Sequence, residues 1–356
     1  MKVLYFGLYD PNYARNWVLI SGLRRNNVEV TELRQKPSRF DLIKLFFDYL
    51  RLKTDYDVMI VGFPGQGVMF LARLFTLRPF SGQVQKPIIF DVFTSHYGGY
   101  ILDRQINSPR SLRAKYYRFL DKWSCKLADL VLLDTSAHID FFVKEYGLKK
   151  EKFKKIWVGV NDEIFYPREI PKEDQTFRII FFGTYIPLQG VEYIVKAAEI
   201  LKDCPDIIFK LIGRGQEKPK IISLVNELKL RNIVFEDMLS QEKLALEISK
   251  ADISLGIFGD TPKTPLVIPN KVFIAAAMKK VIITADTQAV RELFTKDDLL
   301  LVKAADPKSL AEGILKLKNN PNIGITLANN SYDKFKERAR PDVLGLELKN
   351  IIINLI

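Results

Sequence analysis

Short apolar runs alternate with longer amphipathic segments along the first half of the chain. An apolar run of about four to eight residues between turn signals is typical of a buried strand, whereas apolar positions repeating every three to four residues indicate a helix. The predicted strands are Lys2–Phe6, Val28–Leu33, Val58–Val61, Pro87–Phe90 and Leu130–Leu133, and the predicted helices are Asn16–Asn26, Arg39–Arg51, Val68–Leu77, Ser111–Ala128 and Ser136–Tyr146. This β-α-β order predicts a parallel sheet covered by helices on both faces.

A second series with the same rhythm begins at Arg178. Its predicted strands are Arg178–Phe182, Ile207–Ile212, Ile233–Phe235, Ile253–Gly256, Val281–Thr284 and Leu299–Val302, separated by helices such as Val191–Lys202 and Gln241–Lys250. Between the two series, Pro167 and Pro171 stand among charged residues, which favours a linker. The tail from Ser331 is predicted to be helical with a break at Pro341.

The chain is therefore predicted to be an α/β protein with two doubly wound, Rossmann-like domains in tandem. The predicted parts are an N-terminal domain over residues 1–165, a linker over 166–177, a C-terminal domain over 178–335 and a final helix over 336–356 that is a candidate to cross back to the first domain. Ligands of such sheets bind beyond the carboxyl ends of the strands. We therefore expect a ligand cleft between the two domains.

The composition of the chain indicates where in the cell the protein is expected. No apolar run approaches the roughly 20 residues of a membrane-spanning helix, and Met1-Lys2 leads directly into a strand-like run without a leader pattern. The two cysteines, Cys125 and Cys204, fall in different halves and lack the spacing of metal ligands. We expect a reduced, cytoplasmic setting.

The positive charge is concentrated in the first half. The net charge of the chain is +12, and residues 1–170 hold 27 Lys and Arg against 18 Asp and Glu, a net charge of +9. A basic half predicts an anionic partner such as a phospholipid surface, a lipid-phosphate carrier or nucleic acid. The alternative is a solvated basic face on a lysine-rich protein.

Two glycine-containing turns follow neighbouring strands of the second series. Gly183-Thr184-Tyr185 comes directly after the first strand, and Gly213-Arg214-Gly215 comes after the second. Glycine lets the backbone approach a ligand closely, and the arginine fork matches phosphate oxygens. Phosphate binding is the prediction, with an ordinary strand-to-helix turn as the alternative.

A third anion-binding candidate is Pro269-Asn270-Lys271, which opens the helical run Val272–Met278. Proline suits a helix start, where the backbone N–H groups lack partners, and Lys271 adds a positive charge beside them. A diphosphate is the expected ligand. The alternative is a lysine on a solvated helix end.

In the first series, Asp91 ends a strand and His96 lies in the following loop, Thr94–Gly99. Catalytic groups often occupy such strand ends, so both are catalytic candidates, while a loop histidine without a role is the alternative. His138 lies within a predicted helix and is interpreted as structural. The sequence contains no nucleophile triad, zinc-ligand cluster or P-loop lysine motif, which disfavours a hydrolase or a kinase.

The order and spacing of these motifs resemble glycosyltransferase family 4, the retaining GT-B enzymes, over nearly the full length. The pieces that carry the resemblance are Tyr13–Asn16, Phe90-Asp91 with Ser95 and Tyr97, Asp103-Arg104, Ala128-Asp129, Asp134-Thr135, Val158–Asn161, Phe165–Pro167, Phe182–Gly190, Gly213–Gly215, Ala251-Asp252 and Ile268–Lys271. The resemblance implies an acceptor site in the first domain, a nucleotide-sugar site in the second and no obligatory metal. It also implies no cofactor, since the nucleotide sugar is a substrate.

The resemblance also assigns roles to residues of this sequence. The implied donor-binding residues are Gly183, Thr184, Gln189, Arg214, Gly215, Asn270 and Lys271, with Glu292 as a candidate for a hydroxyl contact. The implied acceptor-binding residues are Tyr13, Arg15, Asn16, Tyr97 and Arg104, and His96 and Asp91 would shape the site beside the anomeric carbon.

Several positions depart from the family pattern. Leu266 and Ile274 stand where such enzymes usually carry a Glu-x7-Glu pair, and Thr184 and Gln189 replace a common Arg and Lys. Lys279-Lys280 stands where Gly-Lys is frequent, and Gly98 replaces a common aspartate. The loss of the ribose contact predicts weaker donor binding, because one buried hydrogen bond contributes about 0.5–1.5 kcal/mol.

Two functions remain in competition at this stage. The first is a retaining transferase that moves a hexose from a UDP- or GDP-sugar to a glycan or lipid-linked acceptor, in the cytoplasm or peripherally at the inner face of an anionic membrane. The second is a weakly active or non-catalytic GT-B protein that binds a glycan or a partner glycosyltransferase. Nucleic acid is not an expected partner, since no aromatic-basic motif accompanies the charge.

Overall fold

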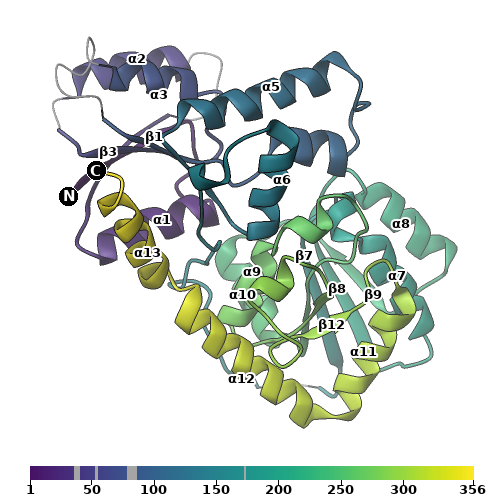
Figure 1. Cartoon of the computed structure of the whole chain (residues 1–356). Coiled ribbons are helices and arrows are strands. Elements are labelled where there is room, and N and C mark those ends of the chain that lie inside the picture. Colours follow the sequence, from purple (N-terminus) through teal and green to yellow (C-terminus); the bar gives the residue numbers. More distant parts are fainter. Residues whose placement is uncertain (36–40, 53–54, 78–85, 172–173) are drawn as a thin grey trace. The chain divides into compact units, whose positions relative to one another are not determined.

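The computed structural model describes residues 1–35, 41–52, 55–77, 86–171 and 174–356. The first two residues of the predicted helix Arg39–Arg51, and residues 172–173 of the predicted linker, lie outside the described part. The chain divides into two compact units (Figure 1). Unit 1 contains residues 1–101, 105–161 and 338–356, and unit 2 contains residues 102–104 and 162–337. Each unit is built on one parallel sheet.

The sheet of unit 1 has the strand order β2-β1-β3-β4-β5-β6. Its strands are β1 (Lys2–Gly7), β2 (Glu29–Arg34), β3 (Val58–Val61), β4 (Ile88–Asp91), β5 (Leu130–Leu133) and β6 (Phe153–Lys155). All neighbouring strands are parallel. The central strands β3, β4 and β5 are buried at every position, as expected for a sheet covered on both faces.

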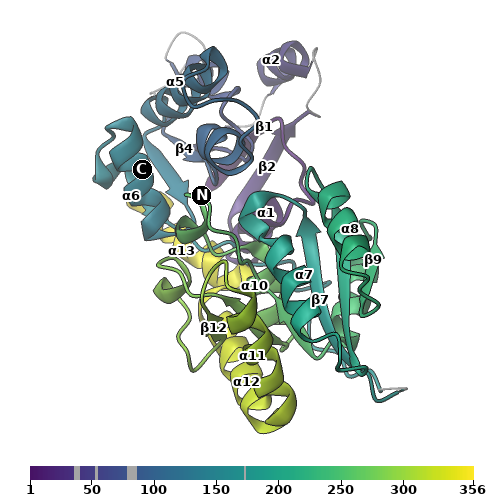
Figure 2. The same cartoon turned by 90° about the vertical axis from the view of Figure 1, so that its right-hand side faces the viewer.

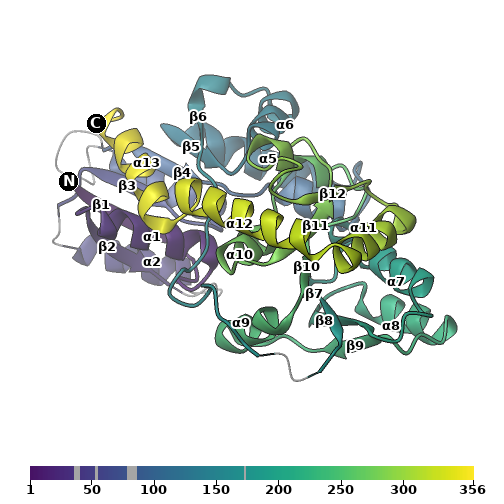
Figure 3. The same ribbon diagram turned by 90° about the horizontal axis from the view of Figure 1, so that it is seen from below.

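The helices of unit 1 lie in two layers, as right-handed crossovers require. They are α1 (Ala14–Arg25), α2 (Asp41–Arg51), α3 (Met69–Thr76), α5 (Leu112–Leu127), α6 (Ser136–Tyr146) and α13 (Pro341–Ile353). Helices α1 and α13 pack side by side on one face, while α2, α3 and α5 lie on the other (Figures 1 and 3). A Cβ on Gly345 would lie 2.0 Å from the carbonyl carbon of Gly22, so two glycines permit the close approach of α1 and α13.

The sheet of unit 2 has the strand order β12-β11-β10-β7-β8-β9. Its strands are β7 (Phe177–Thr184), β8 (Ile207–Arg214), β9 (Ile233–Glu236), β10 (Ile253–Leu255), β11 (Val281–Ala285) and β12 (Leu300–Val302). Its helices are α7 (Val191–Ile200), α8 (Lys218–Glu227), α9 (Gln241–Lys250), α10 (Asn270–Ala277), α11 (Pro307–Asn319) and α12 (Pro321–Arg338). Figure 2 shows α7 and α8 beside β7 and β9. The two-sheet α/β fold predicted from the sequence is confirmed.

Two elements of unit 1 differ from the prediction. The edge strand β6 was not expected, because its sequence Phe-Lys-Lys has one apolar residue and only three positions. The predicted loop after Asp91 runs into a π-helix over Tyr97–Asp103. Its glycine pair, Gly98-Gly99, favours a loop locally, but the N–H of Tyr97 donates to the buried carboxylate of Asp121, 2.9 Å away. Tertiary contacts therefore decide the conformation of this segment.

Among the described residues, no helix combines the length and the apolar character that crossing a membrane requires.

Candidate functional site

The carboxyl ends of β7 and β8 bring the two predicted glycine turns together. The register pairs Gly183 with Gly213 and Thr184 with Arg214, and the N–H of Tyr185 donates to the carbonyl of Arg214 at 2.9 Å. Gly213 has a φ of +140°, and a Cβ there would lie 1.9 Å from the Gly183 carbonyl oxygen. Glycine at 213 is therefore required by the contact between the strands themselves, whether or not a ligand binds.

Lys271 lies buried at the start of α10, and its ammonium group reaches the end of β7. Its side chain donates a hydrogen bond to the side-chain carbonyl of Gln189, and Nζ lies 3.7 Å from the centroid of the Phe181 ring. A Cβ on Gly183 would approach Nζ to 3.2 Å, so the absence of a side chain there leaves room for the ammonium group. The structure thus joins three predicted donor residues, Gly183, Gln189 and Lys271, in one cluster.

Lys271 lies in an electrostatic environment that is unusual for a lysine. Lys271 is only 5% exposed, and burial lowers the pKa of its amine well below the ordinary lysine value. The contacts that the described residues make with Nζ are an amide oxygen and an aromatic face, neither of which is an anion. A buried ammonium ion needs a counter-charge to offset its desolvation. The cluster is therefore suited to receive an anionic ligand.

The backbone around Gln189 is held by the loop that follows β10. Pro187–Gln189 form a 3-10 turn, and Gly190 adopts the left-handed conformation with a φ of 63°. The carbonyl of Gln189 accepts from the N–H of Phe258 at 3.1 Å. A Cβ on Gly190 would lie 2.4 Å from the Gly259 nitrogen, so this turn also needs glycine. These contacts fix the side chain that binds Lys271.

The other predicted donor residues occupy more open positions. Arg214 is exposed at the end of β8, while Thr184, Gly215 and Asn270 are half-buried. Glu292 lies half-buried in the 3-10 turn Val290–Glu292, which follows β11. Arg214 is therefore a second cation at the same strand ends as Lys271.

Lys218, which sequence reasoning missed, lies beside the glycine turn of β8. Its ammonium group donates to the Gly213 carbonyl at 2.8 Å and to the Asp237 carboxylate at 2.6 Å. The signal that could have revealed it is its position in the first turn of α8, four residues after Arg214 in an anion-binding type of strand-helix connection.

Arg104 was predicted to bind the acceptor as part of the first domain, and this placement is wrong. Residues 102–104 belong to unit 2, where the N–H of Leu188 donates to the Asp103 carboxylate at 2.8 Å. The Arg104 carbonyl accepts from the Gln216 side chain at 3.1 Å. Sequence spacing cannot reveal such a placement, because the residues before and after this segment in the chain belong to unit 1.

Arg15 and Asp91 form a buried ion pair inside unit 1. The Arg15 guanidinium donates to both Asp91 oxygens at 2.9–3.1 Å and to the carbonyls of Ile156 and Trp157 at 2.7 Å. Burial raises the pKa of the Asp91 carboxyl, and the Arg15 charge opposes this rise. Both side chains have no exposed surface. We correct the prediction accordingly: the pair joins α1 to the ends of β4 and β6, and neither residue is placed to contact a substrate directly.

Asn16 is also part of the framework and not of an acceptor surface. Its Oδ1 accepts from the Tyr5 hydroxyl at 3.0 Å and from the Phe63 N–H at 3.1 Å. Its Nδ2 donates to the carbonyls of Asp10 and Phe63 at 3.0 and 2.7 Å. Since the amide is buried and fully bonded, we correct this prediction in the same way.

Tyr13 differs from these two residues because it is partly exposed. Its ring contacts those of Phe63 and Phe93, with centroids 5.3 and 6.1 Å away. Its aromatic face and its accessibility keep it as an acceptor-binding candidate.

His96 sits above a network of hydrogen bonds centred on Asp121. The Asp121 carboxylate accepts from the N–H of His96 at 3.0 Å and from the hydroxyls of Ser95 and Tyr146 at 2.7 and 3.0 Å. The His96 ring lies beside Tyr100, and burial lowers the pKa of the imidazole. The buried Nδ1 of His96 has no hydrogen-bond partner among the described residues. The lowered pKa favours the neutral form of the imidazole.

Tyr97 is buried, so its predicted acceptor contact is replaced by a structural one. The Arg118 guanidinium stacks on its ring at 4.3 Å. Asp121 is the residue of this region that sequence reasoning missed, because a carboxylate in the middle of a helix carries no motif.

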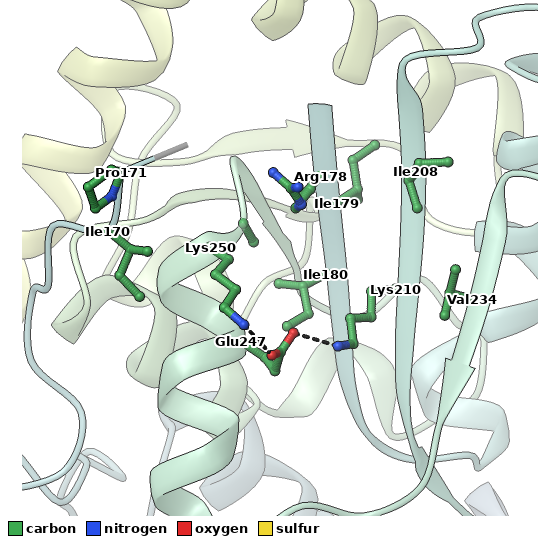
Figure 4. A pocket seen from close by; sticks show the side chains of 11 residues that line it. Ile170, Pro171, Arg178, Ile179, Ile180, Ile208, Lys210, Val234, Glu247 and Lys250 are labelled. Carbon is green, nitrogen blue, oxygen red and sulfur yellow. Dashed lines mark hydrogen bonds and ion pairs between the residues drawn. The ribbon is translucent and has the colours of Figure 1, made fainter. Parts of the chain in front are cut away.

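A cavity of about 350 Å³ lies elsewhere in unit 2 (Figure 4). Arg178 and Ile208, from the amino ends of β7 and β8, line it together with Glu247 and Lys250 of α9. Glu247 bonds to both Lys210 and Lys250 (Figure 4), so its charge is already neutralised. Because the cavity lies at the opposite end of the strands from Gly183, it is separate from the Lys271 cluster.

Residues 176–320, which contain the whole Lys271 cluster, match the family model described as glycosyl transferases group 1. This stretch, which is most of unit 2, is therefore similar to the group 1 glycosyltransferases. The chain is 28% identical over 190 residues to an uncharacterised glycosyltransferase of Methanocaldococcus jannaschii. This stretch is 51% of the chain and 48% of that protein, so the chain matches about half the length of its curated relative.

Solved structures extend the likeness to both units. Anabaena HepE, solved with UDP-glucose, has a TM-score of 0.73 at 15% identity, covering 99% of this chain and all of that one. Sucrose-phosphate synthase from Thermosynechococcus elongatus has a TM-score of 0.74 at 14% identity, covering 100% and 99% of the two chains. At such low identity the likeness concerns the fold, and this chain has the GT-B fold that the sequence predicted.

Within the described residues, no group of three or more His, Cys, Asp and Glu side chains is arranged to hold a metal ion.

Proposed function

We propose that this glycosyltransferase moves a hexose from a nucleotide-diphosphate sugar, a UDP- or GDP-sugar, to a glycan or lipid-linked acceptor with retention of configuration. The observation that carries the proposal is Lys271, a buried ammonium group with neutral partners at the end of β7. Cleavage of a sugar–diphosphate bond leaves negative charge on the β-phosphate, and positive groups already in place stabilise that charge. A diphosphate is the anion that this reaction brings to the site.

Each residue of the cluster has a distinct part in this proposal. Lys271 binds the diphosphate by exchanging its hydrogen bond to the Gln189 oxygen for one to a phosphate oxygen. This new hydrogen bond strengthens as the leaving group becomes more negative. Arg214 contributes a bidentate donor from the exposed end of β8. Gly183, Thr184 and Gly215 present backbone at the same strand ends, and Asn270 does so at the start of α10. Glu292 is the proposed partner of a donor hydroxyl.

On the acceptor side we propose His96 and Tyr13. The neutral imidazole of His96 can accept a hydrogen bond from an acceptor hydroxyl, and the Tyr13 ring offers an aromatic surface on which a sugar can stack. HepE was solved with UDP and glucose, which supports UDP-glucose as the first donor to test. The basic first half supports a cytoplasmic enzyme at an anionic membrane surface as the setting.

A non-catalytic GT-B protein is the second candidate. The apolar side chain of Leu266, at a position where a glutamate is expected, favours it. Leu266 stands at one position of the expected glutamate pair and packs against a small apolar cluster of Ile186, Leu188, Ile257 and Val267. Ile274, at the other position, is half-buried in α10. Two apolar side chains cannot accept hydrogen bonds from donor hydroxyls, so these two positions add no hydroxyl contact to donor binding.

A binding experiment followed by a turnover experiment separates the two candidates. Thermal denaturation is measured with millimolar UDP, GDP and ADP and their sugars, for the wild type, Lys271→Met and the control Lys308→Met, whose lysine is exposed on α11. We expect a nucleotide to raise the Tm of the wild type and the control but not of Lys271→Met. If no nucleotide raises the Tm of the wild type, the enzyme proposal fails.

Slow hydrolysis of the bound sugar nucleotide is then followed by NMR. Release of the sugar with the anomeric configuration of the donor supports a retaining enzyme. Binding without turnover of any donor supports the non-catalytic candidate.

A further inference from the structure

Helix α5 buries some polar residues and exposes several large apolar ones. Its buried positions include Asp121, Ser124 and Cys125, while a line of large apolar residues faces outward. These exposed residues are Leu112, Tyr116, Phe119 and Trp123, with exposed fractions of 83, 57, 50 and 41%. Their spacing of four, three and four residues places them on one face along the helix. This face runs along most of α5, whose 16 residues span about 24 Å at 1.5 Å per residue.

The charges on α5 that are not buried are all positive. The helix, which the structure describes in full, carries five basic residues and one acidic residue, and that residue, Asp121, is buried in the network below His96. Arg113, Lys115 and Lys126 are exposed, and Lys126 lies over the Trp123 ring at 4.7 Å. Arg118 is also exposed and pairs with Glu145 of α6. The apolar face is therefore bordered by basic groups without an exposed carboxylate on the helix.

A second apolar surface lies on the neighbouring helices α2 and α3. Helices α2, α3 and α5 lie on the same face of the unit 1 sheet (Figure 1). Between α2 and α3 runs an apolar groove of about 470 Å³, whose lining includes Ile43, Phe47 and Phe70. These three side chains are about half exposed. A soluble chain seldom exposes so many large apolar residues together unless they serve an interaction.

We propose that the outer face of α5, defined by Leu112, Tyr116, Phe119 and Trp123, binds the headgroup region of an anionic lipid bilayer. Tyr and Trp are the side chains favoured at the membrane–water boundary, and Lys and Arg beside an apolar face attract anionic lipids. The Lys stems lie along the apolar surface while their ammonium groups reach the phosphates. Charge complementarity selects a lipid surface over a second copy of this basic chain, whose like charges would repel it.

This inference goes beyond the sugar transfer and does not rest on it. Every residue of the proposed surface belongs to unit 1, whereas the Lys271 cluster belongs to unit 2. Failure of membrane binding would leave the nucleotide experiments unaffected, and failure of nucleotide binding would leave the membrane proposal standing.

The test is flotation of the full-length protein with large unilamellar vesicles of phosphatidylcholine alone or of phosphatidylcholine with about one third phosphatidylglycerol. The variants are Phe119→Ser with Trp123→Ser, and Lys115→Gln with Lys122→Gln and Lys126→Gln. The control is Ile325→Ser with Leu346→Ser, since both side chains are about half exposed on α12 and α13. Circular dichroism and thermal denaturation confirm that each variant is folded.

We expect the wild type and the control to float with the anionic vesicles and not with the neutral ones. Removal of three lysines should weaken partitioning by about one hundredfold, because each basic residue near an anionic surface contributes about fivefold. The serine variant should lose binding by at least tenfold. Equal binding by all variants, or no binding by the wild type, would overturn the proposal. So would concentration-dependent dimerisation that the serine variant abolishes, because a second copy would then occupy this face.

Insertion of the helix face is tested separately by fluorescence. In a Trp17→Phe and Trp157→Phe protein, Trp123 is the remaining tryptophan. Anionic vesicles should shift its emission to the blue, and brominated lipids should quench it. An unchanged spectrum with bound vesicles would contradict the assignment to α5.

Discussion

The ammonium group of Lys271 donates a hydrogen bond to the side-chain carbonyl of Gln189, and both side chains are buried at the carboxyl end of β7. This contact joins the start of α10 to the turn after β7, which lie 82 positions apart in the chain. Burial of the charged Lys271 side chain destabilises the ligand-free protein, whereas the same charge stabilises the complex once an anion binds. Three of the predictions below concern this site.

Replacing Lys271 with Met should stabilise the ligand-free protein. Methionine fills a similar volume without a buried charge, and removing such a charge raises the free energy of unfolding by on the order of 1 kcal/mol. Urea denaturation at pH 7 measures this difference. The matched variant Lys308→Met, on the exposed face of α11, should change stability by less than about 0.5 kcal/mol. A destabilised Lys271→Met protein would mean that the lysine is needed for packing.

The wild-type protein should gain stability as the pH rises towards 10. Burial lowers the pKa of Lys271 in the folded state, so the unfolded chain binds the extra proton at pH values between the folded pKa and the ordinary lysine value of about 10.4. Deprotonation of the unfolded chain removes this disadvantage. Urea denaturation between pH 7 and pH 10 should show a rise in the wild type that exceeds that of Lys271→Met. Parallel curves would rule out a lowered pKa.

Binding of a nucleoside diphosphate should take up protons. An anion beside Lys271 favours the charged amine and raises its pKa, so a fraction of the amine that was neutral becomes protonated on binding. Calorimetric titration of UDP in two buffers with different ionisation enthalpies measures the proton number. We expect net uptake in the wild type at pH 8–9. The phosphate of UDP itself contributes below about pH 7, which sets the lower limit of the window.

Gly213→Ala should destabilise unit 2 by about 2–3 kcal/mol. Residue 213 has a φ of +140°, and its new Cβ would lie 1.9 Å from the Gly183 carbonyl oxygen, so the ends of β7 and β8 must separate. Gly67→Ala is the matched control, since a Cβ there meets nothing within 4 Å. Thermal denaturation compares the two variants. Equal melting temperatures would show that the strand ends can adapt without loss.

Asp91→Asn should lower the free energy of unfolding by about 3–5 kcal/mol, because it leaves the buried Arg15 guanidinium without a counter-charge. Urea denaturation measures the loss, and the double variant Arg15→Met with Asp91→Leu should recover part of it. A stable Asp91→Asn protein that has lost only its transferase activity would restore the catalytic role that the sequence predicted for Asp91.

The α/β class and most strand positions followed from local pattern. Strands such as Val58–Val61 are buried on both faces, so they read as continuous apolar runs, and the helices between them carry a helical repeat. The edge strand β6 and the π-helix Tyr97–Asp103 escaped prediction because distant residues stabilise them, as Asp121 does through the N–H of Tyr97. Local propensity is weakest where such contacts decide the conformation.

The sequence by itself determined that glycines end β7 and β8 and that a lysine opens α10, because these residue types have local conformational requirements. Only the tertiary structure decided which partners they meet. Lys271 reaches Gln189 because parallel strands place their carboxyl ends at one edge of the sheet. Arg15 pairs with Asp91 because an unpaired charge is too unfavourable in a buried position. The same applies to α5, which exposes large apolar residues while Asp121 is anchored inside the fold.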